Sequence, residues 1–267
     1  MSPVRSIGSM LAAITLTLLP ASRLAASAPP HAIRADTVHL EVGAAEVDGR
    51  TFTPHRARVV VRLGAPDGPI VADWINELTL GDSAGRAVHR WLTSGTQRPP
   101  NGPTSTWEIR QTIDARTQTP LGYHRTGSGG ADVQLAIDGT TVTGRRRPSA
   151  QAADEPVHWS LDKPGFVASA SDLVPLAMTL RPGMVITAPM WAPNAARTHT
   201  VIFTVIGQEP RVVEGRTWNA WRVEERRASD RVLTATWFLV HESPYMVAGE
   251  VVQPDGQVRY MTEVAVP

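Results

Sequence analysis

The chain has 267 residues, of which 42% are hydrophobic and 19% charged, a composition that excludes intrinsic disorder and can supply a substantial core. The formal net charge is +1, from 26 basic and 25 acidic residues, so we expect no nucleic-acid partner. The chain has no cysteine, which excludes disulfides, thiolate metal sites and cysteine nucleophiles.

Residues 1–26 are predicted to form a signal peptide. Arg5 supplies a positive charge, and the apolar stretch from Met10 to Leu19 is shorter than the ~20 residues that a membrane-spanning helix needs. Small residues follow, and we expect cleavage after Ala26 and a periplasmic or extracellular location. A leader retained as an N-terminal anchor is the alternative. No later segment is long and apolar enough to be a transmembrane helix.

Residues 36–267 are predicted to form a single β-rich domain. Apolar and polar residues alternate from Val38 to Val42 and from Ala57 to Leu63, the period of a strand with one buried face. Further strands are expected over 74–80, 88–92, 107–113, 121–125, 133–137, 201–205, 218–225 and 232–240. Two loop-like stretches, 97–104 and 145–156, are possible domain boundaries. We favour one continuous sheet, because neither half alone has the strand pattern of a complete closed domain.

Four Asp-Gly pairs, which begin at Asp48, Asp67, Asp138 and Asp255, lie beside these strands. Asp and Gly tolerate the positive φ that a type I′ hairpin turn requires. The pairs therefore predict an antiparallel meander. Its last hairpin is expected to join 245–252 to 258–266 through a two-residue turn at Asp255 and Gly256.

One helix is predicted, over Ser171 to Leu180. Ser169 or Ser171 can cap it, and Asp172 suits the positive end of the helix dipole. Pro175 is tolerated only in the first turn, so the helix should be short. The predicted fold class is all-β: a curved antiparallel meander or half-barrel with one short covering helix.

From Trp107 onward the layout resembles an uncharacterised family of exported bacterial β-rich proteins, a domain of unknown function. The shared motifs are a Thr-Pro-Leu segment at 119–121, Val-x-Leu-x-Ile-Asp-Gly at 133–139, Asp-Leu-Val-Pro-Leu at 172–176, Arg-Pro-Gly at 181–183, Val-Ile-Gly at 205–207, Glu-Gly at 214–215, Trp-Phe-Leu at 237–239 and Ser-Pro-Tyr at 243–245. The resemblance implies a curved antiparallel sheet with helix cover, similar in outline to envelope lipid-carrier half-barrels. It supplies no catalytic residues.

Motifs for metal or catalytic chemistry are weak. The eight histidines include no His-x-His pair, and His241-Glu242 begins a zinc motif in which Tyr245 takes the place of the second histidine. Ser128 lies among glycines without an obvious base and is interpreted as part of a flexible turn. We therefore predict no metal, no cofactor and no catalytic residue.

Adjacent carboxylates occur at Asp154-Glu155 and at Glu224-Glu225. Neighbouring residues on a strand point to opposite faces, so Glu224 and Glu225 should not converge on one substrate. Both are interpreted as solvated charges at a strand edge.

The eight tryptophans fit either a packed core or an apolar cleft. Trp159, Trp191 and Trp237 flank the expected helix or lie in strands expected beneath it, and we predict that these three bind a ligand. Met178, Met184 and Met190 suit an adaptable apolar rim, and packing of the helix against the sheet explains them equally well.

These observations favour an exported, non-enzymatic protein that binds an apolar small molecule or lipid of the envelope between the sheet and the helix. Two alternatives stay open. One is a secreted hydrolase whose acidic residues meet only in the fold. The other is a cell-envelope interaction module that uses a sheet edge. The sequence gives no oligomeric state.

Overall fold

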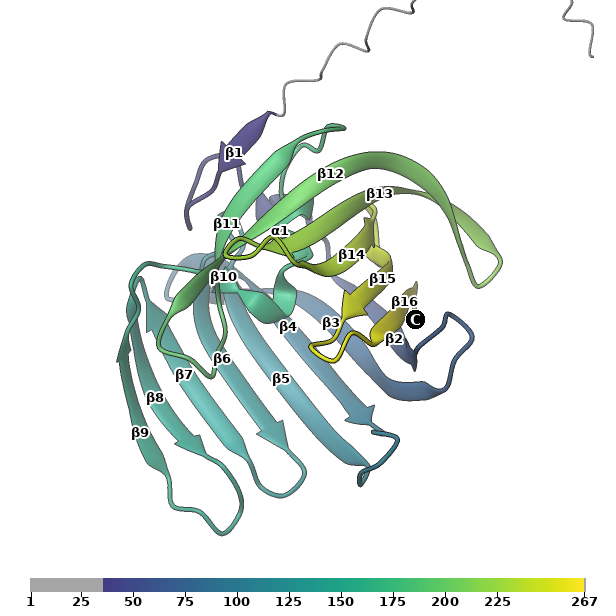
Figure 1. The fold of residues 1–267 in the computed structure, drawn as a ribbon. Helices are drawn as coiled ribbons and strands as arrows, with labels where there is room; N and C mark the ends of the chain where they lie inside the picture. Colours follow the sequence, from purple (N-terminus) through teal and green to yellow (C-terminus); the bar gives the residue numbers. More distant parts are fainter. Residues whose placement is uncertain (1–35, 267) are drawn as a thin grey trace, which may run out of the picture. The chain divides into compact units, whose positions relative to one another are not determined.

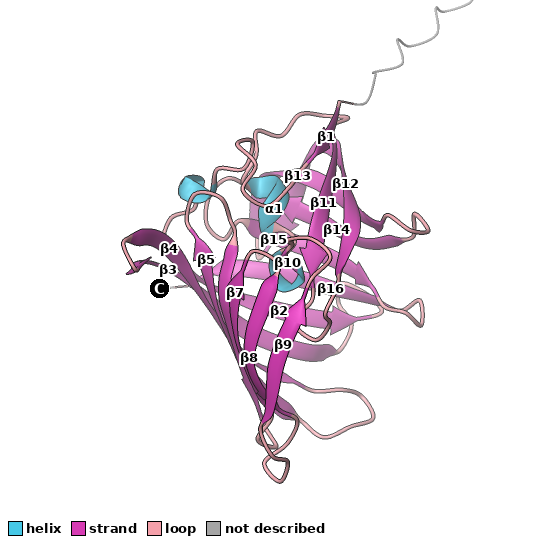
Figure 2. Cartoon of the chain, turned by 90° about the vertical axis from the view of Figure 1, so that its left-hand side faces the viewer, coloured by secondary structure: helices cyan, strands magenta, loops and turns pink. Residues whose placement is uncertain are grey.

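The computed structural model describes residues 36–266, so the predicted leader, residues 1–26, lies outside the described residues. A single unclosed sheet of 16 strands dominates this part of the chain, with very short helical pieces (Figures 1 and 2). The predicted all-β class and curved meander are confirmed. In residues 36–266 no helix is both long and apolar enough to cross a membrane.

Two antiparallel meanders make up most of the sheet. The first is β2 (His55–Leu63), β3 (Ile70–Ser83), β4 (Arg86–Gln97), β5 (Ser105–Asp114), β6 (Pro120–Gly127), β7 (Asp132–Asp138), β8 (Thr141–Arg147) and β9 (Glu155–Ser160). The second is β11 (Val185–Trp191), β12 (Thr198–Val213), β13 (Arg216–Arg227), β14 (Leu233–Leu239), β15 (Met246–Val252) and β16 (Val258–Ala265). The predicted loop over 97–104 is confirmed, whereas the polar stretch 145–156 contributes to β8 and β9.

The two meanders join where β16 pairs with β2, in an antiparallel register that places Tyr260 opposite Arg62. At the far side of the second meander, β1 (Thr37–His39) and β10 (Phe166–Val167) both pair with β11 in parallel. No ladder among residues 36–266 joins β9 to β11, so the sheet stays open there.

The helix α1 is a single turn, Leu173–Leu176, and it follows the 3-10 turn η2 (Ala168–Ala170). It is shorter than the predicted 171–180: Asp172 is its N-cap, without a side-chain cap hydrogen bond, and the backbone leaves the helical conformation at the C-cap, Ala177. All four of its residues are buried, and Leu173, Val174 and Leu176 belong to the main core. Figure 1 shows α1 between the two meanders, where it covers the concave side of the sheet.

The hairpin between β15 and β16 forms where predicted, but the predicted two-residue type I′ turn is wrong. The N–H of Gly256 donates to the carbonyl of Gln253 at 2.9 Å, so Pro254 and Asp255 are the central residues. Gly256 follows them at a φ of +81°, and Asp255 is not among the described residues with positive φ. This is a type I turn with a following left-handed glycine, which Pro254 favours because its ring fixes φ near −65°.

A second Asp-Gly pair is not a hairpin turn. Asp48 caps the 3-10 turn η1 (Gly49–Thr51), and its carboxylate accepts a hydrogen bond from the N–H of Arg50. The pairs at Asp67 and Asp138 do lie at connections between consecutive strands, but neither is the predicted type I′ turn. The N–H of Gly68 donates to the carbonyl of Ala65, so Pro66 and Asp67 are central there, and Asp138 ends β7 opposite Thr141. Neither Asp67 nor Asp138 is among the described residues with positive φ.

Candidate ligand-binding cavity

A cavity of about 410 Å³ lies on the concave side of the sheet, between strands of both meanders and beside the segment that leads into α1. Its apolar walls come from aromatic, methionine and branched side chains, and a smaller set of hydroxyl, amide and carboxyl groups interrupts them. The residues that line it are Trp74, Asn76, Thr93, Trp107, Ile109, Gln111, Ala168, Ser169, Ser171, Asp172, Glu225, Thr234, Ala235, Trp237, Met246, Val251, Val252 and Met261.

Three tryptophans dominate the apolar part, and we call this space the tryptophan cavity. The rings of Trp74 on β3 and Trp107 on β5 lie 5.8 Å apart between centroids, at an angle of 56°. Trp237 comes from β14 in the other meander. Strand alternation explains the inward direction of Trp74, since Ala72 and Leu78 on the same face of β3 are also buried.

Glu225 of β13 reaches into the tryptophan cavity and is held there by neutral donors. Its Oε2 accepts hydrogen bonds from the Ser171 hydroxyl and the Trp237 indole N–H, both at 2.9 Å. Its Oε1 accepts a hydrogen bond from the Thr234 hydroxyl at 3.1 Å. The carboxylate is therefore fixed in place by residues of β14 and of the segment before α1.

A polar recess of about 50 Å³ adjoins the cavity and shares Asn76, Gln111 and Asp172 with its lining. Glu263 of β16 lies here and accepts a hydrogen bond from the side-chain amide of Asn76 at 2.8 Å. Two buried polar atoms of the recess, Oε1 of Gln111 and Nε1 of Trp91, have no hydrogen-bond partner among the described residues. Such atoms are costly to bury without a partner.

Two carboxyl groups of this region have raised pKa values. Burial raises the pKa of Asp172 to about 6, and the nearby charge of Glu225 adds to the effect. Burial also raises the pKa of Glu263 well above its usual range, although the hydrogen bond from Asn76 opposes the shift. Raised carboxyl pKa values in a cavity are typical of binding and catalytic sites, and also of structural networks.

The three predicted ligand-binding tryptophans lie in two places. Trp237 lines the tryptophan cavity. Trp191 is fully buried, with its indole N–H bonded to the carbonyl of Ala195 at 2.9 Å, and half-buried Trp159 packs against the same second hydrophobic cluster. That cluster also contains Val142 and Leu161, and it fills the space between β8, β9 and the end of β11.

Sequence reasoning missed most of the cavity. Trp74 and Trp107 come from the first meander, and only the joining of β16 to β2 brings that meander opposite Trp237. The interpretation of Glu225 as a solvated strand-edge charge is wrong, because Glu225 faces the cavity. The expected divergence from Glu224 is confirmed: Glu224 pairs instead with Arg222 and Arg226, at 3.2 and 2.9 Å.

Of the two interpretations of Met178, Met184 and Met190, core packing is the one that the structure shows, because all three are buried in the main core. Met246 and Met261 line the tryptophan cavity in their place.

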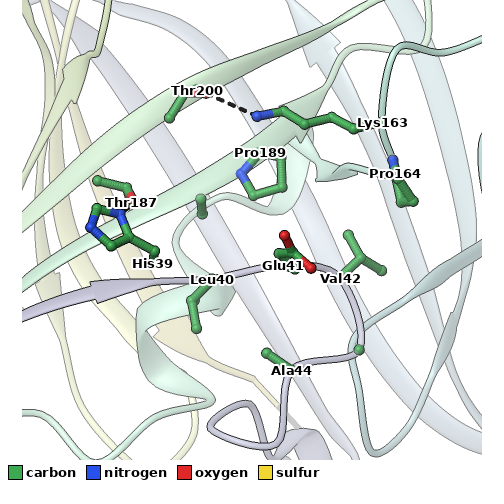
Figure 3. A pocket seen from close by; sticks show the side chains of 12 residues that line it. His39, Leu40, Glu41, Val42, Ala44, Lys163, Pro164, Thr187, Pro189 and Thr200 are labelled. Carbon is green, nitrogen blue, oxygen red and sulfur yellow. Dashed lines mark hydrogen bonds between the residues drawn. The ribbon is translucent and has the colours of Figure 1, made fainter.

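A larger groove, of about 740 Å³, lies between residues 39–44, the chain at Lys163 and the β11–β12 ladder (Figure 3). Four of its polar side chains pair with one another: His39 Nδ1 lies 2.7 Å from the Thr187 hydroxyl, and Lys163 Nζ lies 3.4 Å from that of Thr200. Because this groove offers no unpartnered buried polar atom, we favour the tryptophan cavity as the site. Residues 36–266 hold no group of three His, Asp or Glu side chains placed to bind a metal ion.

Comparisons with known proteins give a likeness of fold. No protein-family model and no curated protein matches the sequence. A solved β-barrel-like protein of the domain of unknown function DUF1849, from Brucella abortus, is similar over 84% of this chain and 98% of its own, with 11% identity and a TM-score of 0.50. The hypothetical lipoprotein YmcC from Escherichia coli matches 78% of this chain and 86% of its own, with 12% identity and a TM-score of 0.31, which is too low to support an argument. The resemblance to uncharacterised β-rich proteins of unknown function is thus confirmed at the level of the fold.

Proposed function

We propose that this protein is an exported binding protein that holds one amphipathic envelope molecule in the tryptophan cavity. The main support is one observation: an aromatic cavity adjoins a polar recess that contains buried polar atoms without partners. The volume of about 410 Å³ lies within the ~300–1,000 Å³ of small-molecule sites. Apolar parts of a ligand would gain ~25 cal/mol for each Å² removed from water.

An envelope location follows from the predicted leader and is part of the proposal. The test is N-terminal sequencing of the protein recovered outside the cytoplasm. We expect a mature chain that begins near Ser27, and an intact Met1 in that material would contradict the proposal.

The binding role can be tested with N-phenyl-1-naphthylamine, a neutral apolar probe that accepts excitation energy from tryptophan. We expect saturable binding that Trp237→Phe weakens about fivefold, for a loss of ~1 kcal/mol of contact. Trp159→Phe is the matched control. Trp159 is half-buried and packs against the second hydrophobic cluster, away from the tryptophan cavity. Equal loss in both variants would move the site away from the tryptophan cavity, and no saturable binding would reject the role.

A second candidate is the secreted hydrolase, which one observation favours. Asp172, with a pKa raised to about 6 by burial and by Glu225, could serve as a general acid beside a charged carboxylate. Aryl glycosides and esters are the substrates to screen. Hydrolysis that Asp172→Asn abolishes would favour this candidate, and hydrolysis unaffected by the substitution would reject it.

A further inference from the structure

The charged groups that line the tryptophan cavity and the polar recess are of one sign. Asp172, Glu225 and Glu263 contribute carboxyl groups, and no Arg, Lys or His lines either space among the described residues. The chain elsewhere is nearly balanced in charge and rich in arginine. Glu225, and Asp172 where it is ionised, would therefore repel a bound anionic group and attract a cationic one, whereas burial favours the neutral form of Glu263.

Adjacent residues on β13 show that this environment is specific to the cavity. Glu224, on the other face of the strand, pairs with Arg222 and Arg226. Glu225 forms no ion pair with any described residue and is held by the neutral donors Ser171, Thr234 and Trp237. The carboxylate is therefore fixed in position, and the described residue of basic type that it acts on is His199: burial lowers the pKa of His199, and Glu225 opposes that shift without forming an ion pair.

An independent feature of the same space is the side chain of Gln111. Gln111 is only 5% exposed and lines both the cavity and the recess. The Oε1 atom of Gln111 nevertheless has no hydrogen-bond partner among the described residues. A buried carbonyl oxygen of this kind accepts a hydrogen bond from a donor that enters the space. An ammonium group carries such donors, and a carboxylate or sulfate does not.

The aromatic walls fit the same chemistry. A cation placed over the face of an indole ring is attracted to it, and tryptophan is the strongest of the aromatic side chains in this respect. Trp74 and Trp107 form one aromatic wall, and Trp237 contacts Glu225 directly. The space thus combines indole rings, carboxyl groups that form no ion pair with a described residue, the free acceptor of Gln111 and the free indole donor of Trp91.

We propose that the molecule bound in this cavity is an amphipathic cation, with an apolar body and an amine group that is protonated at neutral pH. The amine would lie near Glu225, Asp172 and Gln111, and the apolar body would lie among Trp74, Trp107 and the neighbouring aliphatic side chains. This inference rests on the proposed binding role, and it excludes anionic lipid head groups from the cavity.

The test compares three ligands that share one alkyl chain: decylammonium, decanol and decanoate. Calorimetric titration of the full mature protein at neutral pH should give a dissociation constant for decylammonium about tenfold lower than that for decanol, and decanoate should bind most weakly. If all three bind equally well, the inference is overturned and the proposed binding role stands. If none of them binds and the neutral probe does not bind either, the binding role itself fails.

Variants then locate the preference for the cation. Glu225→Gln should remove most of the tenfold preference, and Asp172→Asn, as a second variant, should reduce it. Glu224→Gln is the matched control, because it removes the same charge from the adjacent position on the other face of β13, and it should leave the preference unchanged. Near-ultraviolet circular dichroism checks that each variant is folded. If Glu225→Gln and Asp172→Asn both keep the preference for decylammonium, the cation binds outside the cavity and the inference is overturned.

Discussion

The phenol oxygen of Tyr245 accepts a hydrogen bond from the backbone N–H of Thr53 at 2.6 Å, and it lies 3.0 Å from the Thr53 hydroxyl. Tyr245 precedes β15, and Thr53 precedes β2, so the contact ties the start of one meander to a late hairpin of the other. Phe52 and His55 pack edge-on against the same ring, with centroids 5.1 and 4.8 Å away.

Tyr245→Phe keeps these ring contacts and removes the hydroxyl, so it leaves the N–H of Thr53 without its partner. We expect the free energy of unfolding to fall by about 1–2 kcal/mol, measured by urea denaturation. Tyr260→Phe on β16 is the control, because the Tyr260 hydroxyl makes no hydrogen bond within residues 36–266, and it should change stability little. Equal effects in the two variants would show that the hydroxyl of Tyr245 contributes nothing specific.

Gly256 is expected to be required for the last hairpin. It has a φ of +81°, and a Cβ there would meet no atom within 4 Å, so any cost arises from the backbone and not from a clash. Gly256→Val should destabilise the protein by about 1–3 kcal/mol. Gly256→Asn should cost much less, since asparagine tolerates the left-handed region. Thermal melting of both variants tests this, and equal melting temperatures would contradict the assigned conformation.

Asp172 should make stability depend on pH. Its pKa rises from 3.8 to about 6 on folding, so between these values the folded state holds a proton that the unfolded state has lost. Stability therefore falls as pH rises through this window. The charged group that raises the pKa of Asp172 further is Glu225 of β13, and Asp172 in turn raises the pKa of Glu263 of β16.

Asp172→Asn mimics the protonated form and removes this penalty. We expect the variant to exceed the wild type in unfolding free energy by about 1–3 kcal/mol above pH 7, and by much less at pH 4. Asp162→Asn is a control of opposite sign: hydrogen bonds from Thr198 lower the pKa of Asp162, so its loss should destabilise the protein at neutral pH. A constant difference between Asp172→Asn and the wild type across pH would contradict the shift.

Glu263 is buried, at 4% exposure, and burial raises the pKa of its carboxyl group, which favours the neutral form. Glu263→Gln keeps an acceptor for the Asn76 amide and should leave stability within about 0.5 kcal/mol of the wild type. Glu263→Leu leaves that amide unpaired and should cost about 1–3 kcal/mol. Chemical denaturation at neutral pH compares the two. A large loss in Glu263→Gln would show that the carboxyl group is charged in the folded protein.

Local patterns predict most of the strands, because alternation acts over a few positions, but they predict no strand over β8, β9, β10 or β11. The error at Asp255 has a local cause: Pro254 takes the first central position and moves the glycine out of the turn centre. The error at Glu225 has a non-local cause. Nothing near Glu225 in the sequence indicates that β14 and the segment before α1 supply its hydrogen-bond donors. The cavity could not be predicted from the sequence for the same reason, because Trp74 and Trp237 belong to different meanders.

The pairing of β2 with β16 also constrains how the protein is made. During synthesis the first meander emerges well before β16, and until then its β2 edge has unpaired backbone groups. Such long-range pairing forms slowly. A nascent or truncated chain without β16 would expose this edge to aggregation and would lack Met261 from the cavity lining, so pairing of β16 both protects the edge and completes the cavity.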